Sequence, residues 1–530
     1  MVTPDGDGPL GLDSPEVDEA GGSDVALGEI QSAGAEVVLA TGAPGLLSRR
    51  TRPKKRAHAA RSSRSRWARG AILGAVAVVG IGLWAGIARV NAPLRQLTTA
   101  ATTDAAMLVP GAAPVLPWPS QGQGAIAVPA LGVAEQSGPE ASVPIASLTK
   151  ITTALVILRD HPLAPGEDGP MITITPLDMA EYNFEVHHDE SSVPIYLGET
   201  LSERQLLEAM LIVSANDAAF ALAVWDAGTV RDFVVKMNSL AASLDMTGTS
   251  YADASGYDTH TVSTAADVLR ASAAGMAIPS FAEIVAMQTT TFPSVGTLHN
   301  RVPEVGVNGV IGIKSGYTSK AGACMVLAAN RMVSGRSVLV IVAVLGQPTP
   351  PPILPTTTTT TRPRSTPTTT PPTPPGAATA TTSGPTTTTE PRRSGPTTTT
   401  TSIPYDELVI ADPYKFTRPV VESLLQSAKA GLVDAEVAAA HQQVGTVAST
   451  WGGRSHPVPV VTSTAAHLPG WPGTAVHSMV RYRTVAPGSK AGTVAGTVLY
   501  AIGSEFQGVP IVLSDTVAEP NWWWRLVHGS

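Results

Sequence analysis

The stretch Gly309–Leu345, GVIGIKSGYTSKAGACMVLAANRMVSGRSVLVIVAVL, decides the fold of this 530-residue chain. Residues rich in Val, Ile and Ala predict strands over 309–314, 323–330 and 337–345, and Gly335 marks the turn between the last two. Strands that follow one another at such short intervals are typical of an antiparallel sheet.

The residues before this stretch predict helices, because their apolar side chains recur at helical spacing. These helices cover 145–160 (with ITTALVIL), 199–225 (RQLLEAMLI and DAAFALAVW, with a kink at Ser214-Ala215-Asn216) and 263–274 (capped by Ser263 or Thr264 and stopped by Gly275). Helices first and strands later predict an α+β domain, an antiparallel sheet covered by helices.

The first segment that suggests chemistry is Ser147-Leu148-Thr149-Lys150, at the start of the first helix. An offset of three residues puts Ser147 and Lys150 on one helical face, within reach of each other. A serine hydroxyl becomes a nucleophile when a base takes its proton, and a desolvated lysine can be that base. The free N–H groups at a helix start can stabilise an oxyanion.

A second segment is the kink Ser214-Ala215-Asn216, where side chains can leave a helical surface and enter a cleft. There Ser214 could relay a proton and Asn216 could hold a substrate amide. Taken alone, the segment is also an ordinary helix cap.

The third segment, Lys314-Ser315-Gly316-Tyr317-Thr318, follows a predicted strand that could bind an extended peptide along its edge. Lys314 offers a positive charge to a carboxylate, and Ser315 and Thr318 offer hydroxyls. Gly316 permits close backbone approach. Taken alone, the segment is also an ordinary surface turn.

Together, the three segments resemble the motif set S-x-x-K, S-x-N and K-T-G of the penicillin-binding and serine β-lactamase superfamily. They stand 67 and 100 residues apart. IASLTKITTALVIL, LLEAMLIVSANDAA and GVIGIKSGYTSKAG are similar to segments of the serine D-alanyl-D-alanine carboxypeptidases, the low-molecular-mass penicillin-binding proteins. Ser315 stands where Thr is usual, which retains the hydroxyl.

The resemblance implies a transpeptidase-like fold and a membrane-anchored DD-carboxypeptidase that removes the terminal D-alanine from peptidoglycan stem pentapeptides. Ser147 would be the nucleophile, Lys150 its base and Ser214 the proton relay, while Asn216 would position the substrate amide. The backbone N–H of Tyr317 would complete the oxyanion hole, and Lys314, Ser315, Gly316 and Thr318 would bind the substrate. β-Lactams would be covalent inhibitors, and no cofactor or metal would be needed.

Charge and hydropathy predict the membrane topology of the chain. Residues 1–48 contain nine acidic and no basic residues, and 49–69 contain ten basic and no acidic ones, so 1–69 should be a disordered cytoplasmic tail. The uncharged run 70–88 would span roughly 28 Å as a helix, enough for one membrane crossing. Residues 89–111 would be a linker, and everything beyond them would lie outside the cytoplasm.

The Thr/Pro-rich tract 347–402 has no helical or strand periodicity, and we expect it to be a disordered insertion, decorated with sugars or bare. RPVVESLLQSAKAGL, from Arg418, is similar to the last helix of the family's catalytic domain. That domain would therefore consist of 112–346 and 403–432. Residues 433–530 alternate short apolar runs with Gly and Pro and predict a small C-terminal all-β domain.

Several other functions have to be weighed. A DD-endopeptidase that cleaves peptidoglycan cross-links would share all three motifs. A class A β-lactamase needs a deacylating Glu, and the only E-x-x-x-N string after the second motif, Glu304–Asn308, lies too near Lys314. A non-catalytic wall-binding protein would not need its motif residues intact.

Other sequence features argue against two further classes. The net charge of −7 disfavours nucleic acid as a partner. His187-His188-Asp189 is the only His-rich spot and lacks a zinc-peptidase pattern, so it should be a solvated loop.

Overall fold

The computed structural model describes residues 63–101, 107–350, 412–451 and 454–528. Most of the predicted tail (1–62) and most of the Thr/Pro-rich tract (351–402) lie outside these residues. Helix α1 (Ser63–Val90) begins seven residues before the predicted span. Within the described residues, its portion Trp67–Val90 is the one unbroken helix that is long and apolar enough to cross a membrane.

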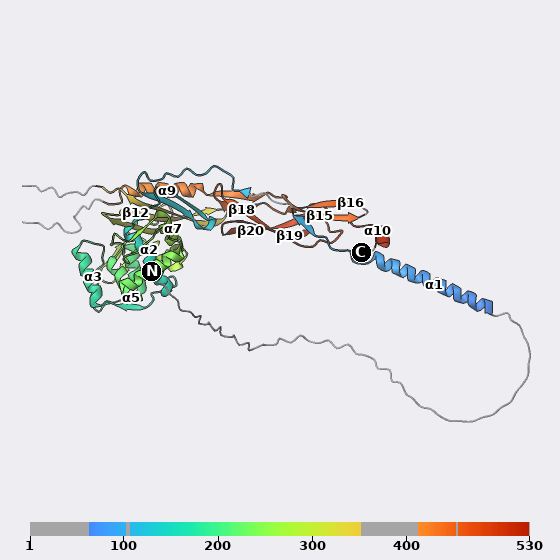
Figure 1. The fold of residues 1–530 in the computed structure, drawn as a ribbon, viewed down its shortest axis with the longest axis horizontal. Coiled ribbons are helices and arrows are strands. Elements are labelled where there is room, and N and C mark those ends of the chain that lie inside the picture. The colour runs from blue at the N-terminus through green and yellow to red at the C-terminus, as the bar shows by residue number, and fades with distance from the viewer. Residues whose placement is uncertain (1–62, 102–106, 351–411, 452–453, 529–530) are drawn as a thin grey trace, which may run out of the picture. The chain divides into compact units, whose positions relative to one another are not determined.

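A five-stranded antiparallel sheet, in the order β11-β12-β13-β3-β4, forms the centre of the next folded region (Figure 1). Its strands are β3 (Gln123–Val128), β4 (Val133–Ser137), β11 (Val310–Thr318), β12 (Gly322–Val333) and β13 (Arg336–Gln347). The last three confirm the three predicted strands. The middle of β13 is buried because VLVIVAVL supplies apolar side chains to both faces.

The turn between β12 and β13 shows why Gly335 stands where it does. Val333 pairs with Arg336, so only Ser334 and Gly335 lie between the strands. Both have positive φ, 51° and 72°. Two-residue hairpin turns of this hand favour glycine, as the sequence predicted.

Helices cover both faces of the central sheet. Ile341 and Ala343 of β13 pack in the core that contains α2 and α7, whereas Val340 and Val342 pack in the core that contains α9. The helices of the first layer are α2 (Thr149–Asp160), α3 (Pro176–His187), α4 (Glu203–Ile212), α5 (Asn216–Ala227), α6 (Val230–Ser243), α7 (Ala265–Met276) and α8 (Pro279–Val285). The predicted α+β architecture is thus confirmed.

Some helix boundaries follow the sequence signals, whereas α2 and α4 each begin four residues after the predicted starts at 145 and 199. The kink at 213–215 separates α4 from α5 as predicted, and the Thr264 hydroxyl caps α7 by accepting from Asp267 N. Gly275 does not stop α7, which ends at Met276. Gly275 is buried against the ring of Phe281, where a Cβ would have no room. This glycine therefore serves packing and not chain termination.

Short elements complete the layer. They are the 3₁₀ helices η1 (Pro129–Leu131) and η2 (Ala146–Leu148), and the strand pairs β5 (Val143–Pro144) with β8 (Val262–Ser263), β6 (Met171–Thr173) with β7 (Thr200–Ser202), and β9 (Thr289–Phe292) with β10 (Gly296–His299). The η2 turn leads directly into the buried helix α2.

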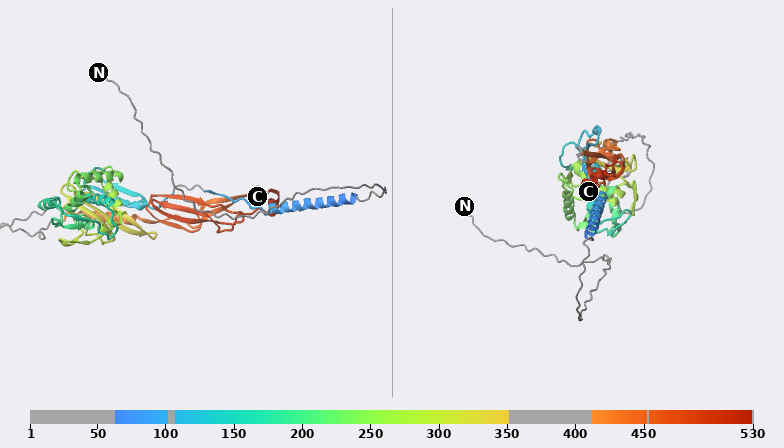
Figure 2. Two further views of the ribbon diagram at one scale, coloured as in Figure 1. Left: turned by 90° about the horizontal axis from the view of Figure 1, so that it is seen from below. Right: turned by 90° about the vertical axis from the view of Figure 1, so that its right-hand side faces the viewer.

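Helix α9 (Thr417–Gly431) returns the chain to the central sheet after the undescribed residues 351–411 and packs against β12 and β13. The chain then forms sheets of its own, distinct from the central one (Figure 2). Their strands are β14 (Val433–Ala438), β15 (Gln443–Trp451), β16 (Arg454–Thr462), β17 (Ala466–Gly470), β18 (Ala475–Tyr482), β19 (Val494–Ile502) and β20 (Glu505–Leu513). A short helix, α10 (Trp522–His528), follows.

The residues expected to be a linker, 89–111, contribute to this C-terminal sheet. Strand β1 (Thr99–Ala101) pairs with β15, and β2 (Met107–Leu108) pairs with β18. The seven-stranded sheet has the order β1-β15-β16-β20-β19-β18-β2. The chain therefore pairs with strands of the C-terminal sheet before it enters the central sheet at β3.

Candidate active site

Ser147 lies in η2, immediately before α2. The residue before it, Ala146, has φ +49°, an uncommon conformation for a residue with a side chain. Thr149 Oγ1 donates to Ala146 O at 2.9 Å and fixes this turn. The turn thus holds Ser147 at the start of a helix, as the sequence predicted.

Lys150 is fully buried one turn into the helix, and its Nζ makes three hydrogen bonds. It donates to Ser147 Oγ at 3.0 Å, to Asn216 Oδ1 at 2.6 Å and to the carbonyl of Ser255 at 2.9 Å. The structure therefore brings together residues 66 and 105 positions away from Lys150 along the chain.

Burial lowers the pKa of Lys150 from 10.5 to about 8, although nearby carboxylates, Asp253 and Glu185 foremost, favour the charged form. Taking an ammonium out of water is unfavourable, and here that effect exceeds the attraction of the acids. A substantial fraction of Lys150 is thus neutral near pH 8. A neutral amine 3.0 Å from a hydroxyl can take its proton.

The turn between α4 and α5 carries Ser214 and Asn216. Ser214 is buried and has φ +70°, so the turn is strained at the site. No hydrogen bond from the Ser214 hydroxyl is present among the described residues. Asn216 begins α5, and its backbone N–H donates to Ser191 O at 2.7 Å.

Strand β11 lies against the turn that carries Ser147. A Cβ built on Gly316 would be 2.8 Å from Ser147 N and 3.1 Å from Leu148 N. Only glycine permits the backbone of β11 to come this close to Ser147. The edge of the sheet and the serine thus form one site.

Lys314 is fully buried on β11, and its Nζ donates to Ser315 O at 3.1 Å. Burial lowers its pKa well below the usual range, and the charges of Lys150 and Arg301 lower it further. Ser315, also buried, donates from Oγ to Arg301 O at 3.4 Å. Two lysines and an arginine therefore gather where a substrate carboxylate would be attracted.

The remaining predicted residues on β11 differ in their surroundings. The Tyr317 side chain is 43% exposed, so what this residue can offer to the site is its backbone. Thr318 Oγ1 accepts from Ala321 N at 3.0 Å and thereby shapes the turn into β12. Among the described residues, no acceptor for the Thr318 hydroxyl hydrogen is present.

Sequence reasoning missed the segment that supplies the carbonyl to Lys150. Asp253 Oδ2 accepts from the backbone N–H groups of Gly256 and Tyr257 at 2.8 and 2.9 Å, and from Ser255 Oγ at 2.7 Å. Such Asx turns are common where Asp precedes Ser and Gly. The string DASGYD at 253–258 was a usable signal for this turn, but not for its contact with Lys150.

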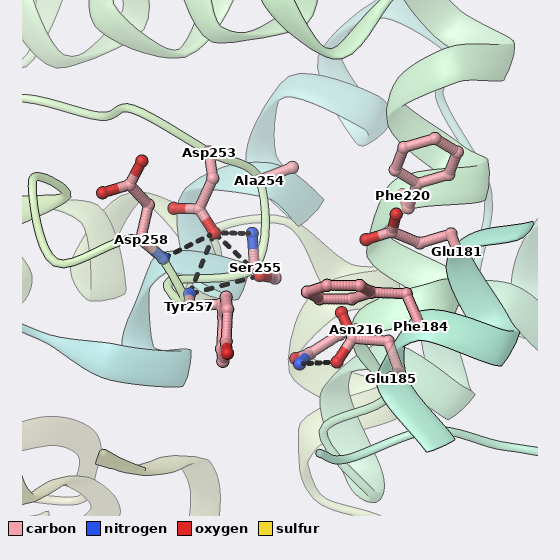
Figure 3. A pocket seen from close by; sticks show the side chains of 10 residues that line it. All are labelled: Glu181, Phe184, Glu185, Asn216, Phe220, Asp253, Ala254, Ser255, Tyr257 and Asp258. Atoms are coloured by element: carbon pink, nitrogen blue, oxygen red, sulfur yellow. Dashed lines mark hydrogen bonds between the residues drawn. The ribbon is translucent and has the colours of Figure 1, made fainter. Parts of the chain in front are cut away.

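Asn216 and Ser255, two of the residues that accept hydrogen bonds from Lys150, also line a pocket of about 130 Å³. Its walls are α3 and the 253–258 segment, with Phe184 facing Tyr257 edge to face at 6.1 Å between ring centroids (Figure 3). Acidic groups, among them Glu181 and Glu185, line it.

Two alternative sites are placed elsewhere by the structure. Glu304 is buried and forms an ion pair with Arg418 of α9, Oε1 to Nε at 3.0 Å. His187 and His188 are exposed at the end of α3, where their Nδ1 atoms bond to backbone carbonyls of that helix. The pair thus lies on a helix end and not on the predicted loop.

Comparison with known proteins gives a family for residues 133–349, whose model is described as D-alanyl-D-alanine carboxypeptidase. The chain is 31% identical over 223 residues to a D-alanyl-D-alanine endopeptidase of Pseudomonas aeruginosa, covering 40% of this chain and 67% of that protein. It is 35% identical over 216 residues to a D-alanyl-D-alanine carboxypeptidase of Mycobacterium tuberculosis, covering 38% of this chain and 67% of that one.

Among solved structures, penicillin-binding protein 5 from Haemophilus influenzae aligns with 77% of this chain and 99% of its own, at 20% identity and a TM-score of 0.45. The Streptomyces K15 DD-transpeptidase aligns with 44% of this chain and 92% of its own, at 25% identity and a TM-score of 0.39.

Proposed function

The chain belongs to the D-alanyl-D-alanine carboxypeptidase family of serine peptidases, and we propose that it removes the terminal D-alanine from peptidoglycan stem pentapeptides. Penicillin-binding DD-peptidase activity is the activity of the family. We propose which residues of this chain perform the reaction, and that the enzyme prefers a terminal D-alanine to a cross-link as its substrate.

One observation carries the assignment of the residues: the Nζ of fully buried Lys150 lies 3.0 Å from Ser147 Oγ. A serine needs a base at hydrogen-bond distance to attack a carbonyl, and the base must be neutral at working pH. Burial lowers the pKa of Lys150 to about 8, so the neutral amine is a substantial fraction near pH 8 and a smaller one at lower pH.

Substrate binding would use the edge of β11. An extended peptide pairs with this edge by backbone hydrogen bonds, and Gly316 permits the scissile carbonyl to approach Ser147. Lys314, Ser315 and Thr318 hold the terminal carboxylate, whose negative charge would favour the protonated form of Lys314. Asn216 binds an amide group of the substrate peptide.

Acylation then begins when neutral Lys150 takes the Ser147 proton and Oγ bonds to the carbonyl carbon. The backbone N–H groups of Ser147 and Tyr317 stabilise the resulting oxyanion. The C–N bond breaks as Ser214 passes a proton from Lys150 to the departing amine, and D-alanine leaves. Water hydrolyses the ester and restores the serine.

The test uses the full chain in detergent with a pentapeptide ending in D-Ala-D-Ala. We expect release of D-alanine, covalent labelling by fluorescent penicillin, and loss of both in Ser147→Ala. A persistent covalent label in that variant would refute Ser147 as the nucleophile. Fast release of hydrolysed penicillin would instead favour a β-lactamase.

A second candidate function is cleavage of cross-links, because the Pseudomonas aeruginosa relative is described as an endopeptidase. Both reactions acylate the same serine and differ in the leaving group. Incubating purified peptidoglycan with the enzyme and analysing the fragments by mass spectrometry separates them. Free D-alanine with intact dimers supports the carboxypeptidase, and loss of dimers supports the endopeptidase.

The same proposal includes the placement in the cell. Residues 70–88 cross the cytoplasmic membrane once, with the basic residues before them inside and the catalytic domain outside. The apolar helix Trp67–Val90 supports this. Protease added to intact spheroplasts should digest the catalytic domain and spare an epitope at the N-terminus; the reverse pattern would overturn the orientation.

A further inference from the structure

Glu185, in the last turn of α3, contacts the site residue Asn216 directly. Its side chain is buried, with the whole residue only 2% exposed, and Oε2 accepts a hydrogen bond from Asn216 Nδ2 at 2.9 Å. Figure 3 shows this bond between two of the residues that line the pocket. No sequence motif pointed to Glu185.

This contact fixes the orientation of the Asn216 amide. With Nδ2 engaged by Glu185, Oδ1 faces Lys150 Nζ at 2.6 Å and accepts its hydrogen bond. If the amide were turned over, Nδ2 would face the lysine, and two donors would oppose each other. Lys150 would then lose one of the three partners that hold it beside Ser147.

We propose that Glu185 is a positioning residue for acylation, holding Asn216 so that the amide oxygen keeps Lys150 directed at Ser147. The inference rests on the proposed function, because it assigns Glu185 a role through Asn216 and Lys150. Glu185 itself touches neither the nucleophile nor the base by any hydrogen bond within the described residues.

Charge is a second, separable property of Glu185. The carboxylates that favour the protonated form of Lys150 are Asp253, Glu185, Asp217 and Glu190. The titratable groups that act electrostatically on Glu185 are the carboxyls of Glu181, Glu190 and Asp217 and the amine of Lys150. A test must therefore distinguish the contact with Asn216 from the charge.

Three variants make this distinction. Glu185→Gln retains an oxygen that can accept from Asn216 but removes the charge. Glu185→Asp retains the charge but is one methylene too short for the contact. Glu190→Gln, the matched control, removes a nearby charge from a half-buried residue whose carboxylate makes no hydrogen bond to Asn216 in the described residues.

The measurement is the second-order rate of acylation by fluorescent penicillin, with the full chain in detergent, from pH 5 to pH 10. Glu185→Asp should lower the limiting rate about tenfold and leave the midpoint of the acid limb in place. Glu185→Gln and Glu190→Gln should retain most of the limiting rate and move the midpoint to lower pH. Melting temperatures of all variants report folding independently.

A wild-type limiting rate in Glu185→Asp overturns the proposal, and so does an equal loss in Glu185→Gln and Glu185→Asp. If wild-type protein takes no penicillin label at all, the proposed function itself has failed. If the wild type is labelled and the Glu185 variants match it, only the positioning role has failed.

Discussion

A Cβ on Gly316 would stand 2.8 Å from the backbone nitrogen of Ser147, closer than real Cβ atoms approach. The neighbouring atoms are backbone, which cannot rotate away. Gly316→Ala should therefore push β11 away from Ser147 and lower the acylation rate by about tenfold or more.

The control for this change is Gly508→Ala, in strand β20. There a Cβ would meet only side-chain atoms, at 3.6 and 4.0 Å, so acylation should not change. Stopped-flow measurement with a chromogenic β-lactam compares the two. Equal rates in Gly316→Ala and wild type would show that the edge of β11 need not touch Ser147.

The pH dependence of acylation should follow Lys150. Because burial lowers its pKa to about 8, the acylation rate should rise with pH and level off above about 8. Lys150→Arg keeps a permanent positive charge and should abolish acylation at every pH. A rate independent of pH from 6 to 9 in the wild type would argue against Lys150 as the base.

Asp217 should make stability depend on pH. Burial raises its pKa from 3.8 to about 7, and both carboxylate oxygens accept from Val193 N at 3.3 and 3.2 Å. The folded state thus holds a proton that the unfolded chain releases between pH 3.8 and 7. The stability this proton contributes is complete below 3.8 and is lost as pH rises through 7.

Asp217→Asn stays neutral, so its melting temperature relative to wild type should increase from pH 5 to pH 8. Differential scanning fluorimetry at several pH values measures this. Asp168→Asn, at an exposed position, is the control and should run parallel to wild type. A constant difference between Asp217→Asn and wild type would contradict the prediction.

Lys314 should act in binding the terminal carboxylate. Lys314→Ala should raise KM for acyl-D-Ala-D-Ala donors about tenfold, the effect of losing a charged hydrogen bond. Lys320→Ala, at an exposed position just beyond β11, should leave KM unchanged. Steady-state assays of D-alanine release give the values. An unchanged KM in Lys314→Ala would remove the anchoring role.

Glu304 should affect stability and not deacylation. Its buried carboxylate pairs with Arg418, so Arg418→Met should leave a buried charge without its partner and lower the melting temperature. Glu304→Gln should leave the lifetime of the penicilloyl-enzyme unchanged. A longer lifetime in that variant would instead give Glu304 the β-lactamase role weighed from its E-x-x-x-N string.

The sequence predicted the elements and motifs whose signals are local. The strands over 309–345 follow from their composition, and the contact of Lys150 with Ser147 follows from helical spacing. The family resemblance alone implied that Asn216 and Lys150 belong to one site, and their direct hydrogen bond was not predicted. Nothing in the sequence between residues 150 and 216 indicates that these two side chains lie within hydrogen-bond distance of each other in the fold.

Residues that act through tertiary contacts were not predictable. Glu185 belongs to a helix whose ordinary amphipathic pattern gives no sign that one carboxylate meets Asn216. The pairing of 99–101 with β15 was hidden for a similar reason, because TAA has no strand signal of its own. The residues of β15 with which it pairs lie more than 300 positions further along the chain.

Helix α9 and strand β13 belong to one packed body, yet residues 351–411 lie between them in the chain. The central sheet and the helix that covers its second face therefore come from two stretches of polypeptide. Side-chain packing holds these stretches together, and the connecting chain is not required for it. A version made as two co-expressed pieces, broken anywhere within 351–411, should reconstitute a penicillin-labelled enzyme. By the same argument, a foreign domain inserted within 351–411 should leave penicillin labelling intact.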